Sequence, residues 1–187
     1  MKMLRITRYI REGAEVYRKY PYEFIVGGFM IGMLNLLFFG ALTGIHFYGM
    51  ACMTLKALRG ERPEISDAFR GFDKAFDVIL AGLAILAGGF ACIAGGFVTG
   101  ALFMYAFPLM VERNVRVREA LRVSMEVARQ DLLGHILFFF LVMFLGLMGT
   151  PLFGIGVFLT LPLAFTPLVV AYHDRTAQEP AQPAAVA

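Results

Sequence analysis

Charged side chains are absent from three long stretches of this sequence, which cover residues 24–55, 78–111 and 132–173. Each stretch is longer than the about 20 apolar residues that one membrane-crossing helix needs, and slightly short for two ordinary crossings. Lys56 and Arg59 can lay their stems along an apolar surface and keep their charges in water, which lengthens the apolar unit. The pattern therefore predicts three helical hairpins, over residues 22–60, 72–112 and 132–173.

The segments before and between the hairpins have a different pattern. In residues 1–21, Ile6, Ile10, Ala14 and Tyr17 recur at spacings of three or four, with Arg and Lys between them. The same spacing recurs in residues 61–77 and 113–131. These segments are predicted to be amphipathic helices that lie on the cytoplasmic surface of a membrane.

The two patterns together predict an all-α fold: an integral membrane bundle of about six short transmembrane helices in three hairpins, with cytoplasmic amphipathic helices. Residues 1–174 form a single membrane domain in this prediction. The tail, residues 175–187, is rich in Ala and Pro and lacks a pattern that could bury a core. We expect it to be disordered.

Composition and charge agree with lipid as the solvent. The chain of 187 residues is 59% hydrophobic and 17% charged, with a mean hydropathy of +0.70. All 17 Lys and Arg residues fall in the blocks 1–23, 56–77, 112–131 and 174–187. Three hairpins put every block on one side, whereas three single long helices would put the second block opposite the first, which the enrichment of basic residues in cytoplasmic loops disfavours. This predicts a bacterial plasma (inner) membrane protein with both termini cytoplasmic.

Acidic residues alternate with the basic ones in these blocks. Some of them can pair between blocks and form a cytoplasmic collar, while the basic excess attracts anionic lipid headgroups. The topology explains the positive charge, so nucleic acid is not an expected partner. No cleavable signal peptide is expected, because charges run through the first 20 residues.

Small residues recur within the hairpins, often every fourth position, where they let helix backbones approach closely. The candidate helix-packing positions are Gly28, Gly32, Gly88, Cys92, Gly96 and Gly100. Packing within the chain is the first interpretation, and a homo-oligomer interface or a ligand groove are the alternatives.

Three further positions are candidates for a polar contact or a helix kink. Asn35 is expected to make an interhelical hydrogen bond. Pro162 and Pro167 interrupt the last helix, and the carbonyl groups that they free must be satisfied by neighbouring hydroxyls, water or local rearrangement. Thr160 and Thr166 stand beside them.

Groups that could carry chemistry are few. His46, His135 and His173 are expected at different depths, and no carboxylate lies at depth, in the three charge-free stretches, to complete a metal site. No nucleophile and base appear together, so neither a catalytic site nor a cofactor is predicted, and the chain is not expected to be an enzyme. The leading hypothesis is a non-enzymatic scaffold, assembly or accessory subunit with a membrane-protein partner. The alternative is a small transporter or channel for a lipid-like or neutral solute.

Several motifs resemble a broad group of bacterial membrane proteins that includes YciC-like proteins and the membrane domain of some glycerophosphoryl diester phosphodiesterases. The motifs are GTPLFGIG at 149–156, AYHD at 171–174, LRGERP at 58–63, FRGF at 69–72 and ALRVS at 120–124. The likeness covers most of residues 24–174. It implies a compact six-helix fold without an established activity. The phosphodiesterase domain that some relatives carry is absent from this sequence, so no hydrolase activity is implied.

Overall fold

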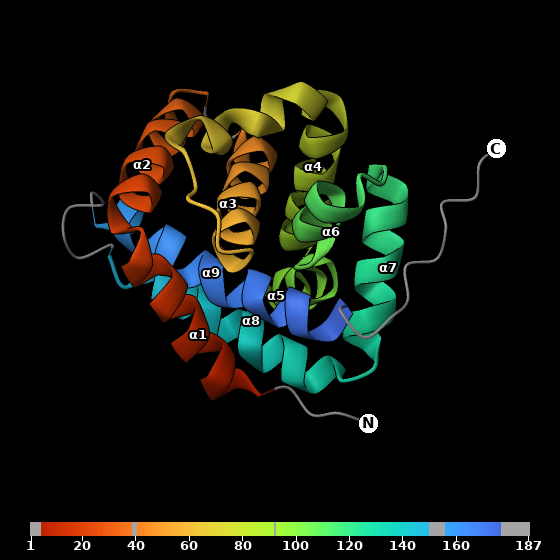
Figure 1. The fold of residues 1–187 in the computed structure, drawn as a ribbon. Coiled ribbons are helices and arrows are strands. Elements are labelled where there is room, and N and C mark those ends of the chain that lie inside the picture. Colours follow the sequence, from red (N-terminus) through yellow and green to blue (C-terminus); the bar gives the residue numbers. More distant parts are fainter. Residues whose placement is uncertain (1–4, 39–40, 92, 150–155, 177–187) are drawn as a thin grey trace.

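The computed structural model describes residues 5–38, 41–91, 93–149 and 156–176, and all regular elements in these ranges are helical (Figure 1). The predicted all-α fold is therefore confirmed. The elements are α1 (Ile6–Lys19), α2 (Pro21–Leu37), α3 (Thr43–Leu58), the 3₁₀ helix η1 (Ile65–Lys74), α4 (Ala75–Ala91), α5 (Ile93–Phe103), α6 (Ala106–Arg113), α7 (Val117–Arg129), α8 (Leu132–Leu147) and α9 (Val157–Thr176).

Each segment predicted as a hairpin contains two or more of these helices. The first contains α2 and α3, and the third contains α8 and most of α9. In the second, α4 is followed by two shorter helices, α5 and α6. The predicted disorder is wrong for the first two residues of the tail, Arg175 and Thr176, because they belong to α9. The rest of the tail lies outside the described residues.

Local interactions at Pro21 and Asp131 accompany two sharp changes in the direction of the chain. Pro21 opens α2, where its missing N–H costs nothing, and α1 and α2 meet at 92°. Asp131 begins α8, because its carboxylate accepts the Gly134 N–H at 3.2 Å. There α7 and α8 meet at 110°.

Helix α3 lies at the centre of the fold and contacts η1, α4, α6 and α9. Figure 1 shows α2, α3 and α4 side by side, with α8 and α9 crossing below them and α1 running alongside α9. The core contains large side chains from distant parts of the sequence. They include Tyr9, Phe24, Ile45, Tyr105, Phe138 and Tyr172.

Isolated glycines allow the closest backbone approaches. A Cβ on Gly13 of α1 would overlap Pro167 of α9, and one on Gly49 of α3 would overlap the backbone of Ala68 in η1. The position that α1 and η1 take therefore depends on glycine at each contact.

All three amphipathic segments differ from their prediction in what covers their apolar faces. The apolar face of α7 is buried, and α5 and α6 are the helices with which α7 makes most of its contacts. Tyr9, Gly13 and Tyr17 of α1 are buried, and α9 is the neighbour with which α1 makes most of its contacts. Ala68 and Gly71 of η1 are buried against α3. Protein covers these faces, for which the spacing of apolar residues alone predicts a membrane surface.

Within the described residues, no single helix is both long enough and apolar enough to cross a membrane. Two bent pairs pass the same test together, by length and composition: α1 with α2, and α7 with α8.

Candidate functional site

Charged side chains from the four blocks meet in one set of contacts, which we call the collar. It consists of Arg8, Glu23, Arg59, Arg62, Glu112, Asp131, Asp174 and Arg175. Each of its ion pairs joins two different blocks, and the fourth block pairs both with the third and with the first. The pairing between blocks that the sequence predicts is confirmed.

The distances in the collar range from direct hydrogen bonds to looser ion pairs. Arg62 lies 2.7 Å from Glu23, and Arg59 lies 3.6 Å from Glu112. The pairs of the fourth block are Arg175 with Asp131 at 3.9 Å and Arg8 with Asp174 at 3.6 Å. Lys74 also donates a hydrogen bond to Asn114, which adds a second contact between the second and third blocks. The collar thus holds segments together that are remote in sequence.

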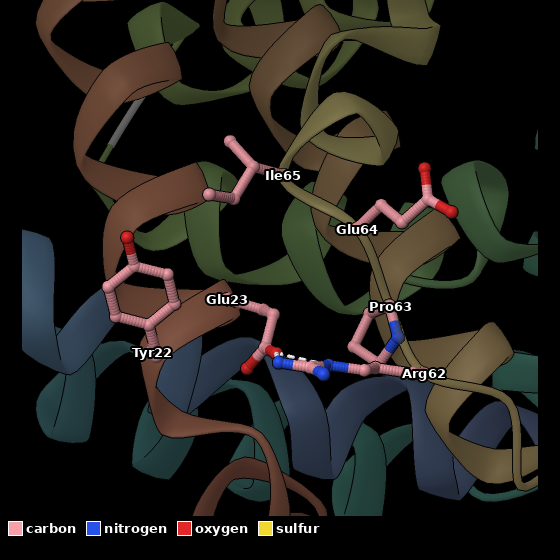
Figure 2. A pocket seen from close by; sticks show the side chains of 6 residues that line it. All are labelled: Tyr22, Glu23, Arg62, Pro63, Glu64 and Ile65. Atoms are coloured by element: carbon pink, nitrogen blue, oxygen red, sulfur yellow. Dashed lines mark hydrogen bonds and ion pairs between the residues drawn. The ribbon is translucent and has the colours of Figure 1, made fainter.

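Glu23 and Arg62 border a surface hollow of about 360 Å³ (Figure 2). Nε of Arg62 donates to Oε1 of Glu23 at 2.7 Å, and Nη2 lies at the same distance from that oxygen. Glu64, which also lines the hollow, points away from this pair (Figure 2). Because the Arg62 side chain is 77% exposed, the pair is expected to contribute no more than about 1 kcal/mol. It connects the start of α2 to the segment before η1.

Behind the collar, tyrosine hydroxyls bind its carboxylates from the core. Tyr9 donates to Asp174 at 2.7 Å, and Tyr172 donates to Glu112 at 2.5 Å. Burial, together with the hydrogen bond to Asp174, raises the pKa of the Tyr9 hydroxyl. Tyr9 therefore stays protonated and remains a donor. The sequence does not predict these two hydrogen bonds, although Tyr9 is a large aromatic residue of the first predicted helix.

Three buried polar atoms near the collar have no hydrogen-bond partner within the described part of the chain. They are the Tyr105 hydroxyl, Nε2 of His135 and Nη2 of Arg175. The rings of Tyr105 and His135 meet edge to face, with centroids 5.6 Å apart. Nδ1 of His135 lies 2.7 Å from the Asp131 carbonyl oxygen, so Nδ1 carries the hydrogen and Nε2 of the neutral ring is an acceptor.

The other two histidines have different surroundings. His46 is buried beside Phe47, and His173 is exposed near the end of α9. The described residues contain no group of three or more His, Cys, Asp or Glu side chains that could hold a metal ion.

An apolar cavity of about 280 Å³ lies among aromatic and aliphatic side chains. Its walls come from α3, α4, α5, α6, α8 and α9. The residues that line it are Thr43, Phe47, Ile85, Gly100, Phe103, Met104, Phe107, Phe139, Val142, Met143, Gly146, Leu147, Leu161, Ala164, Phe165 and Leu168.

Large apolar side chains also lie on the outside of the molecule. Five of them form a stripe on α8 at spacings of three or four residues, namely Leu133, Leu137, Phe140, Phe144 and Leu147, each more than half exposed. The opposite face of α8 is buried through His135, Phe138, Val142 and Gly146. Shorter exposed rows follow α2, at Phe29, Met33 and Leu36, and α4, at Phe76, Leu80 and Leu83.

The predicted packing positions have different environments. A Cβ on Gly100 of α5 would overlap the ring of Phe139 on α8, so this glycine serves helix packing. Gly28 and Gly32 are buried within α2, and Gly96 is half-buried within α5. Gly88 belongs to α4, but its surroundings, like Cys92 altogether, lie outside the described residues.

The predicted polar contacts are found. Asn35 of α2 donates to the Thr43 hydroxyl of α3 at 3.3 Å, which confirms the interhelical hydrogen bond. Pro162 and Pro167 both lie inside α9. Pro167 removes the donor that would bind the Leu163 carbonyl, and the Thr166 hydroxyl donates to that oxygen at 3.1 Å instead.

Comparison with protein-family models, with curated proteins and with solved structures finds no match to this chain. The resemblance noted in the sequence therefore remains a prediction.

Proposed function

We propose that this chain is an integral protein of a bacterial plasma membrane, with its collar on the cytoplasmic side, and that it acts as a non-enzymatic accessory or scaffold protein. The observation that carries membrane insertion is the exposed stripe of α8. Leu137, Phe140 and Phe144 stand on the outer face of a helix that contains no charged residue. A helix that is apolar all round needs a nonaqueous environment on both faces. For α8, the hydrocarbon of the bilayer provides this environment on the outer face, and the protein core provides it on the inner face.

The collar supports the proposed orientation. Its ion pairs join all four charged blocks, so these blocks can share one aqueous side. Every basic residue belongs to these blocks, and basic loops are retained in the cytoplasm. Exposed Arg5, just before α1, and Arg11 and Arg18 of α1 can attract anionic headgroups there.

The outer faces of α1 and α7 support an accessory role. Arg118, Glu119 and Arg122 of α7 are exposed beside the buried positions Val117 and Ala120. Charged faces of this kind suit contacts with the cytoplasmic segments of another membrane protein or of a second copy.

Photocrosslinking in native membranes tests this role. A benzoylphenylalanine at Arg11 or Arg118 is expected to give one discrete protein adduct, because both side chains point away from the core. The same residue at Phe144 is the matched control and is expected to react with lipid only. An adduct of the chain with itself would identify a homo-oligomer as the scaffold. If neither collar-side position captures protein and the chain purifies alone as a monomer, the proposed role is wrong.

A further inference from the structure

The apolar cavity has one firm aromatic wall. The rings of Phe47 and Phe165 stack with centroids 5.6 Å apart and planes 9° from parallel. Phe107 packs on Phe47 at 5.8 Å. Met104 and Met143 also line the space, and their unbranched thioether side chains adapt to the shape of a guest. The cavity therefore combines a firm wall with adjustable side chains.

The cavity lining offers a water molecule almost no hydrogen-bond partners. Thr43 has the one polar side chain among the described residues that line the cavity. Its hydroxyl already accepts a hydrogen bond from Asn35. A water molecule needs two to four polar partners to be stable in a cavity. The guest that fits this lining is apolar and uncharged within the cavity.

The mouth of the cavity opens on the stripe of α8. Met143 and Leu147 line the cavity, yet they are 40% and 56% exposed, so both reach the outer surface. Leu147 is itself a member of the stripe that also contains Phe140 and Phe144. A guest therefore enters from the surface that we propose to face lipid, without passing through water.

We infer that this cavity binds a single hydrocarbon chain of a membrane lipid. This binding site rests on the proposed membrane insertion, because the mouth receives lipid only if α8 faces the bilayer. Among the residues that the structure describes, no charged side chain lines the cavity. The headgroup stays outside, and lipids with different headgroups are bound through the same acyl chain.

Photolabelling with a palmitic acid analogue that carries a diazirine on its chain tests the binding site. The full chain is reconstituted in vesicles of phosphatidylethanolamine and phosphatidylglycerol, and adducts are mapped by mass spectrometry. Adducts are expected at Met104 and Phe165 in the cavity and at Phe144 on the stripe. Adducts at Met104 and Phe165 report a chain inside the cavity, and adducts at Phe144 report lipid contact outside it.

A cavity-filling variant provides the second arm. Ala164→Phe places a ring in the space between α8 and α9 and is expected to abolish labelling of Met104 while Phe144 is labelled as before. Val98→Phe adds the same group to an exposed position of α5 outside the cavity. This matched control should keep both sets of adducts.

The outcomes separate the binding site from the membrane insertion. Cavity adducts that persist in Ala164→Phe, or labelling of Phe144 alone, would overturn the acyl-chain site and leave the membrane insertion standing. Cavity adducts that Ala164→Phe abolishes, without labelling of Phe144, would support the site and contradict the insertion. No adduct at either place would overturn both.

Discussion

Replacing Gly49 with alanine is expected to lower the free energy of unfolding by about 3 kcal/mol, the upper end of the range for overpacked cores, or more. The added methyl group would overlap the carbonyl oxygen, carbonyl carbon and Cα of Ala68, all of them backbone atoms. Backbone cannot rotate out of the way as a side chain can. η1 would have to separate from α3, its principal neighbour.

Gly146→Ala is the matched control for this prediction. A Cβ at Gly146 would lie 3.5 Å from its nearest neighbours, Ala164 and Leu161, which is ordinary van der Waals contact. We expect no loss of stability and a gain of up to about 1 kcal/mol, because alanine is the better helix former. The measurement is unfolding of the chain in mixed micelles, followed by its helical circular dichroism. Equal losses in the two variants would contradict the close approach of η1 to α3.

Replacing Asp67 with alanine is expected to cost about 3 kcal/mol, the lower end of the range for breaking a buried ion pair. The carboxylate is almost completely buried. Its Oδ2 atom accepts from Lys56 Nζ at 2.9 Å and from the Glu64 N–H at 2.8 Å, and Oδ1 lies 3.4 Å from Arg70. The variant leaves the Lys56 ammonium group and the Glu64 N–H without their carboxylate acceptor. The loss stays moderate because Lys56 and Arg70 can turn toward water.

Glu126→Ala is the control, since Glu126 pairs with Arg122 at 2.9 Å on the exposed face of α7. An exposed pair four residues apart on a helix contributes only about 0.3–0.5 kcal/mol. The same unfolding measurement compares the two variants. A loss for Asp67→Ala as small as that for Glu126→Ala would mean that η1 is not held by this carboxylate.

The sequence predicts the helices well because their signals are local. The charge-free stretches locate the hairpin segments, and the spacing of Ile6, Ile10 and Tyr17 predicts α1. The contact of Thr166 with the Leu163 carbonyl follows directly from Pro167, since both partners lie within one helical turn. Asn35 and Thr43 are likewise close in sequence on either side of a short turn.

Contacts between distant segments could not be predicted in the same way. A row of glycines indicates that a helix face is small, but it does not identify the helix that approaches. Gly13 and Gly49, which permit two of the closest approaches, belong to no row of candidates, and their partners Pro167 and Ala68 lie in other elements. The amphipathic spacing of α1 indicates an apolar partner, and it cannot distinguish α9 from lipid.

Charge patterns predict the collar only in part. Interleaved acidic and basic residues predict that the blocks pair, but not which residues do so. The choice of Arg62 for Glu23 and of Arg175 for Asp131 depends on how the helices pack. Among the described residues that line the apolar cavity, only Gly100 belongs to the positions for which a ligand groove is an alternative interpretation. The other lining residues come from six helices and have no sequence pattern that indicates a cavity.

Fluorescence quenching by brominated lipids tests the membrane insertion of this chain most directly. The sequence contains no tryptophan, so Phe144→Trp on α8 and Glu126→Trp on α7 each introduce a single reporter. Both native residues are more than half exposed, Phe144 at 58% of the whole residue and Glu126 at 57% of its side chain. In vesicles of phosphatidylcholine brominated on its acyl chains, strong quenching is expected at residue 144 and little at residue 126. Equal, weak quenching at both positions would contradict a lipid-facing α8 and with it the proposed membrane protein.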